Sequence, residues 1–104
     1  MEKFTINLNV VSIRDLDGNA QYLPEGFCKG FGNNIYMQGA DIDEKDAGRL
    51  IHLHSKSEFV EVTEQELDTI VRVIHEKSQL GFIFKEEIRV YAESIKNSPK
   101  KINQ

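Results

Sequence analysis

The chain has few of the residues and patterns that would place it in a specialised class of protein. Its single cysteine, Cys28, cannot form an internal disulfide, whereas small secreted domains usually carry several cysteines. Its apolar runs are far shorter than the roughly 18 residues needed to cross a bilayer. The first residues alternate polar and apolar side chains, unlike the continuous apolar segment of a signal peptide. We therefore expect a cytoplasmic protein without a membrane partner.

An excess of positive charge is also missing. The formal net charge is −4, and residues 41–68 hold nine acids against three bases, so the acidic charge is local. Nucleic acids reward clustered lysine and arginine through counterion release, so this balance argues against a nucleic-acid partner. The exception is a short basic segment at residues 96–101.

No internal repeat and no low-complexity linker divides the sequence. The 104 residues are 39% hydrophobic and 29% charged, which is typical of one globular domain. We expect a single α+β domain over residues 1–98, followed by a flexible basic tail at residues 99–104.

The N-terminal region has the pattern of a β-hairpin. Apolar and polar residues alternate from Phe4 to Val10, which predicts a half-buried strand continuing to about Ile13. The sequence DLDGN at residues 15–19 tolerates left-handed backbone angles and suits a tight turn into a short return strand at residues 20–23.

Two helices are expected in the middle of the chain. Apolar residues recur at every fourth position from Phe27 to Ile35, which predicts a helix over residues 24–37. Three glycines weaken this helix by up to ~1 kcal/mol each, so it depends on tertiary packing. Asp41 has the position of an N-cap for a second helix over residues 42–54.

The clearest local pattern is a strand at residues 58–62 that leads into a capped helix. The Thr63 hydroxyl can accept from the Glu66 amide, and the Glu66 carboxylate can accept from the Thr63 amide, which is a capping box. Apolar residues then follow from Leu67 at the spacing of one helical face, so the helix should extend to about Lys77.

A last helix completes the expected fold. Apolar residues recur every three or four positions from Phe84 to Ile95 and predict a helix that ends before Pro99. The fold class is therefore α+β. A small antiparallel or mixed sheet, built from the N-terminal hairpin and the strand at residues 58–62, packs against three or four helices, and the strand order is open.

His52 and His54 are the residues that first suggest a metal. On a strand their imidazoles would project to one side, where they could hold a metal ion in a metal-dependent enzyme, the least favoured function. On a helix they lie about 200° apart, so only one could face a site. The acids at residues 41–46 depart from a calcium loop, because Lys45 and Asp46 stand at its fifth and sixth positions. We predict no cofactor.

Two further features favour structural explanations. No histidine is paired in sequence with Cys28, so a small buried thiol is the better interpretation than a nucleophile. The glycines at residues 30–32 lack the spacing of a dinucleotide loop or a P-loop.

Four segments together resemble small uncharacterised proteins of phages and integrated prophages. They are DLDGN at 15–19, GNNIY at 32–36, DAGRLI at 46–51 and VEVTEQEL at 60–67. The resemblance covers residues 4–92 and implies an accessory protein of a mobile element in a bacterial cytoplasm. Its motifs are structural, so it transfers no functional residue.

The leading functional hypothesis is a non-enzymatic protein-interaction or accessory module. Its partner would be another protein or a second copy of the chain in a homodimer. The residues expected to present an acidic face to that partner are Glu58, Glu61, Glu64 and Asp68.

The alternative hypothesis is a nucleic-acid-associated regulator. In this case the last helix and the basic tail would contact phosphate groups. The residues expected to make these contacts are Arg89, Lys96, Lys100 and Lys101.

Overall fold

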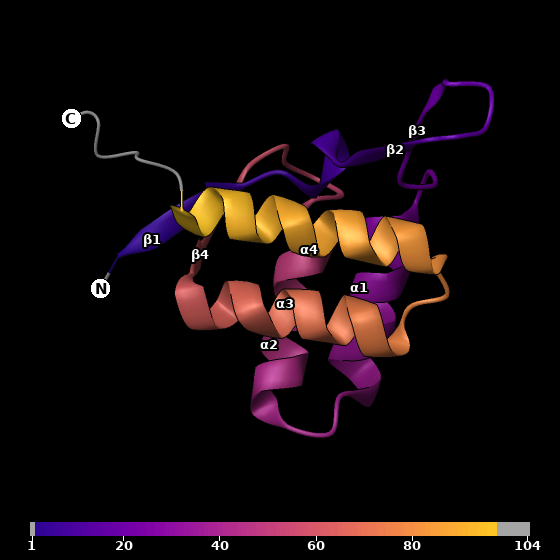
Figure 1. The fold of residues 1–104 in the computed structure, drawn as a ribbon. Coiled ribbons are helices and arrows are strands. Elements are labelled where there is room, and N and C mark those ends of the chain that lie inside the picture. Colours follow the sequence, from indigo (N-terminus) through magenta and orange to yellow (C-terminus); the bar gives the residue numbers. More distant parts are fainter. Residues whose placement is uncertain (1, 98–104) are drawn as a thin grey trace.

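A computed structural model describes residues 2–97, and its helices form two layers (Figure 1). Helices α3 (Glu64–Lys77) and α4 (Phe82–Asn97) lie side by side in one layer. Helices α1 (Phe27–Gln38) and α2 (Ile42–Leu53) form a hairpin in the other, and α2 packs against α3. The predicted α+β class is confirmed, with four helices among the described residues.

The strands form two small antiparallel sheets of two strands each, where the sequence indicated one sheet. Strand β1 (Lys3–Ile6) pairs with β4 (Val60–Thr63) at one end of the helical layers. Strand β2 (Ser12–Arg14) pairs with β3 (Ala20–Tyr22) in the predicted hairpin. The strand expected at residues 58–62 thus begins two residues later.

The long N-terminal strand expected from the alternation is interrupted at Asn7. Its side chain accepts a hydrogen bond from the Asn9 amide at 2.9 Å and starts the 3-10 helix η1 (Leu8–Val10). The Asn7 amide itself donates to the Tyr91 hydroxyl at 2.9 Å. The chain before this break pairs with β4 and the chain after it pairs with β3. Alternation does not reveal such a break, because Leu8 is buried in either arrangement.

Helix α1 begins at Phe27, three residues after the expected start at Pro24. Its N-cap is Gly26, whose φ of 80° lies in the left-handed region that glycine adopts without steric cost. The prolyl residue therefore precedes the helix as part of the turn. The last helix begins two residues earlier than Phe84.

The capped helix α3 confirms its prediction in detail. The Glu66 amide donates to the Thr63 hydroxyl at 3.1 Å, and the Thr63 amide donates to the Glu66 carboxylate at 2.8 Å. The buried face comprises Leu67, Ile70, Val73 and Ile74. Hydrophobic burial of this face fixes α3 between α2 and α4.

The core lies where the helical layers meet the sheet of β1 and β4. Ile6 and Val62 contribute from the sheet, and Ile51, Ile70 and Ile88 contribute from α2, α3 and α4. All five side chains are almost completely buried, and each contributes on the order of 1.5–3 kcal/mol. This packing holds β4 and α2 at a fixed separation.

Candidate functional site

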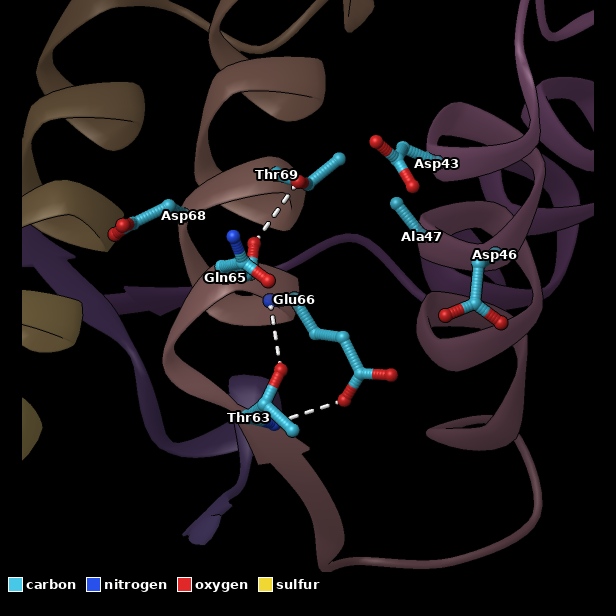
Figure 2. Close-up of a pocket in the computed structure, with 8 residues that line it drawn as sticks. All are labelled: Asp43, Asp46, Ala47, Thr63, Gln65, Glu66, Asp68 and Thr69. Atoms are coloured by element: carbon cyan, nitrogen blue, oxygen red, sulfur yellow. Dashed lines mark hydrogen bonds between the residues drawn. The ribbon is translucent and has the colours of Figure 1, made fainter. Parts of the chain in front are cut away.

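A groove runs between α2 on one side and β4 with the start of α3 on the other. It consists of two hollows of about 520 and 470 Å³, and Glu66 lines both of them. Figure 2 shows the first hollow, where Asp43 and Ala47 of α2 face Glu66 and Thr69 of α3. We call the two hollows together the α2–β4 groove.

The two halves of the α2–β4 groove differ in chemistry. Asp43 and Asp46 give the first half an acidic wall. In the second half Leu50 and Leu53 of α2 lie across from Phe59, whose side chain is 61% exposed. An exposed aromatic ring beside leucines is the kind of surface that protein interfaces bury.

The acids of residues 41–68 fall into two groups. Some are held by local partners: Asp46 pairs with Arg49 at 2.8 Å, and Asp41 and Glu66 cap helices. Among residues 2–97, four of the nine acids form no hydrogen bond and no ion pair through their carboxylates: Asp43, Glu58, Glu61 and Glu64. All four are exposed, so their negative charge faces solvent.

Of the four acids predicted as an interaction face, three have carboxylates without a hydrogen-bond or ion-pair partner within residues 2–97, and the fourth is paired. Glu58, Glu61 and Glu64 border β4 and the first turn of α3. Asp68 instead accepts a hydrogen bond from Lys96 at 2.6 Å. Figure 2 shows its side chain pointing away from α2.

The carboxylate of Glu44, three residues after the N-cap Asp41, is buried at the start of α2. Its Oε1 accepts from the Ala40 amide at 2.6 Å, and its Oε2 lies 3.2 Å from Nζ of Lys77 and 3.6 Å from Arg72. The Ala40 hydrogen bond and the Lys77 ammonium hold the pKa of Glu44 below its ordinary value. This cluster joins the start of α2 to the end of α3 and positions the acidic wall of the groove.

The histidines do not form a metal site. His52 lies in the last turn of α2 and His54 is its C-cap, so the helical alternative holds. The His54 ring is buried, and neither ring nitrogen has a hydrogen-bond partner. Burial lowers the pKa of His54, while nearby backbone groups act in the opposite direction. Residues 2–97 contain no cluster of three or more histidine, cysteine, aspartate or glutamate side chains that could hold a metal ion.

The structure describes two of the four residues predicted for nucleic-acid contact, Arg89 and Lys96. Arg89 pairs with Glu86 at 3.0 Å, and Lys96 pairs with Asp68 and is only 16% exposed. Acids therefore neutralise both basic groups on α4. The other two predicted residues, Lys100 and Lys101, lie outside the described residues.

Cys28 is a buried thiol, as expected. It lies in α1 among apolar side chains, and burial raises its pKa to about 11, which disfavours the reactive thiolate. Gly30 and Gly32 lie inside the same helix and form no phosphate-binding loop.

Comparisons with known proteins give no relative: the sequence matches no family model, and no curated protein or solved structure is detectably similar. Across residues 2–97, every helix is too short or too polar to cross a lipid bilayer.

Proposed function

We propose that this protein is a non-enzymatic interaction module that binds another protein at the α2–β4 groove. The observation that carries the proposal is that the exposed ring of Phe59 and the free carboxylate of Glu61 line the groove. The exposed, free carboxylates of Glu58 and Glu64 flank β4 in the sequence and add negative charge. A buried aromatic anchor surrounded by complementary charge is the usual energetic centre of an interface. The partner would therefore present basic residues around an apolar side chain.

The biological setting is part of the proposal. The resemblance of residues 4–92 to phage and prophage proteins supports an accessory role for a mobile element in a bacterial cytoplasm. An accessory protein of this kind acts through its binding partner, which agrees with the groove having an acidic and an apolar part.

Differential capture tests the proposal. The full chain is tagged and compared with a groove variant carrying Glu58→Gln, Glu61→Gln and Glu64→Gln in a lysate of the cells that encode it. A control variant carries Asp17→Asn, Glu25→Gln and Glu87→Gln, which removes the same charge from exposed acids elsewhere. Captured proteins are quantified by mass spectrometry.

We expect at least one protein to be captured by the unmodified chain and the control variant, with about a tenfold loss for the groove variant. Capture that is equal for all three proteins, or no specific capture, would rule out the groove as the interaction surface. Circular dichroism of the three proteins confirms that each is folded.

A further inference from the structure

The hydrogen-bonding pattern of β1 and β4 leaves an open edge. Opposite residues in an antiparallel pair alternate between hydrogen-bonded and non-hydrogen-bonded pairs. Thr63 lies opposite Lys3, and its amide donates to Glu66 rather than across the sheet. The Asn7 amide, at the other end of β1, donates to the Tyr91 hydroxyl. The pairs Lys3–Thr63 and Thr5–Glu61 are therefore non-hydrogen-bonded pairs. The backbone N–H and C=O groups of such residues point away from the partner strand, toward the outer edges of the sheet.

Thr5 and Glu61, which lie opposite each other, are the central residues of this non-hydrogen-bonded set. Their amide and carbonyl groups point to the two outer edges of the sheet, and both residues are exposed. Among residues 2–97, the backbone groups of Thr5 and Glu61 make no backbone hydrogen bond outside the β1–β4 pairing itself. Unpaired backbone groups at a strand edge are a template for a further strand.

The edge of β4 is bordered by a groove. Glu61 and Val60 of β4 line the second hollow of the α2–β4 groove, opposite Leu50 and Leu53 of α2. From β1, Lys3 also lines this hollow, whereas Thr5 does not. A chain placed along β4 would thus gain backbone hydrogen bonds from Glu61 and apolar contacts from α2.

We propose that the α2–β4 groove binds its partner by strand addition: an extended peptide segment with alternating basic and apolar residues pairs with β4 through the backbone of Glu61. This inference rests on the proposed function of the same groove. Main-chain hydrogen bonds supply affinity in this mode of recognition, and pockets for alternate side chains supply specificity.

Charge complementarity selects this occupant. Glu58, Glu61 and Glu64 have no cationic partner within residues 2–97, and Asp43 adds a fourth free carboxylate in the acidic half. Basic side chains of the peptide pair with these acids, while its apolar side chains contact Phe59 and the leucines of α2.

A second copy of the chain fits this edge less well. Two β4 strands paired about a two-fold axis centred on Glu61 would place the two Glu61 carboxylates directly opposite each other, which is destabilising. Helix α2 also flanks the edge, so it would obstruct a second folded domain more than a single extended chain. The occupant is therefore a peptide segment of another protein.

Fluorescence anisotropy with the full chain tests strand addition. The probe is a labelled peptide of about seven residues with alternating lysine and valine, and its matched control has glutamate in place of lysine. Two further probes are N-methylated on one or the other alternate set of backbone amides, so that one of them cannot donate to β4.

We expect saturable binding of the lysine–valine probe and at least about tenfold weaker binding of the glutamate–valine probe. One N-methylated probe should lose binding and the other should retain it, because only one set of amides faces β4. Phe59→Ala should weaken binding by about tenfold, whereas Phe82→Ala, at a ring that is 66% exposed outside the groove, should leave it unchanged.

Strand addition is overturned if the lysine–valine probe does not bind, or if both N-methylated probes bind equally well. It is also overturned if deletion of residues 98–104 exposes a Glu61 amide that was protected in the full chain, because the groove would then hold the chain's own tail. Loss of the captured protein in the groove variant without binding of the probe would leave the interaction module standing and reject strand addition alone.

Discussion

Gly32 of α1 and Gly48 of α2 lie against each other, and each leaves room for the backbone of the other's helix. A Cβ atom on either glycine would lie 2.8 Å from the carbonyl oxygen of the other. The two helices therefore approach more closely than any larger residue would allow. This contact sets the position of α2, which is one wall of the α2–β4 groove.

Substitution of these glycines should separate the helices. A Cβ on Gly32 would also lie 2.6 Å from the backbone nitrogen of His52, which cannot rotate away. We expect Gly32→Ala and Gly48→Ala each to lower the free energy of unfolding by about 1–3 kcal/mol or more in urea denaturation. Gly30→Ala is the matched control: it meets nothing within 4 Å and should stabilise α1 by about 0.5–1 kcal/mol. Equal effects at Gly30 and Gly32 would contradict the close approach.

The capping box at the start of α3 should contribute measurably to stability. Thr63→Ala removes the acceptor for the Glu66 amide, and we expect a loss of about 1 kcal/mol in the free energy of unfolding. Thr69→Ala removes a hydroxyl that bonds only to the Gln65 carbonyl inside the helix, and it should change stability little. Thermal or urea denaturation of both variants distinguishes a cap from a general effect of losing threonine.

Glu44 should make stability depend on acidic pH. Its pKa is held below the ordinary value of 4.5 by the Ala40 amide and Lys77. The stabilisation is therefore fully present above pH 4.5 and is lost as the pH falls through the lower pKa of the folded state. Glu44→Gln should be less stable than the unmodified chain at about pH 7, and the difference should shrink at about pH 3. Exposed Glu87→Gln should show no such pH-dependent difference, and a constant deficit for Glu44→Gln would argue against the ionic role.

His54 should add a second pH dependence at higher pH. Burial lowers its pKa below the ordinary value of 6.5, so the unfolded chain binds a proton first on acidification. The neutral ring therefore favours the folded state fully above pH 6.5, and this contribution is lost as the pH falls through the folded pKa. His54→Leu should reduce the slope of unfolding free energy against pH in this range. An unchanged slope would show that the ring is already protonated or exposed in the folded protein.

The parts of the fold that follow from local rules could be predicted from the sequence. The capping box of Thr63 and Glu66 and the apolar stripe after it depend on neighbours within two turns, so α3 has its predicted bounds. The break at Asn7 could not be predicted in this way, because it depends on Tyr91, which is 84 residues away. The sequence also contains the glycines of α1, but only the packing of α2 distinguishes Gly32 from Gly30.

The candidate site also combines features that follow from local sequence with features that depend on long-range packing. Local charge predicts Glu58, Glu61 and Glu64 as an interaction face; all three are exposed in the structure, and their binding of a partner stays a prediction. Charge alone could not separate them from Asp68, because its partner Lys96 comes from α4. The groove between α2 and β4 depends on long-range packing, and no sequence pattern indicates it. The unpaired edge at Glu61 follows only from the register of β1 with β4.

Amide hydrogen exchange, followed by NMR on the full chain, tests the open edge in the α2–β4 groove most directly. Val62 lies opposite Phe4, and the alternation along the strands makes this a hydrogen-bonded pair, whereas Glu61 should direct its amide into the groove. We predict that the Glu61 amide exchanges at least about tenfold faster than that of Val62. A Glu61 amide as strongly protected as that of Val62 would contradict an open edge and with it the proposed mode of binding.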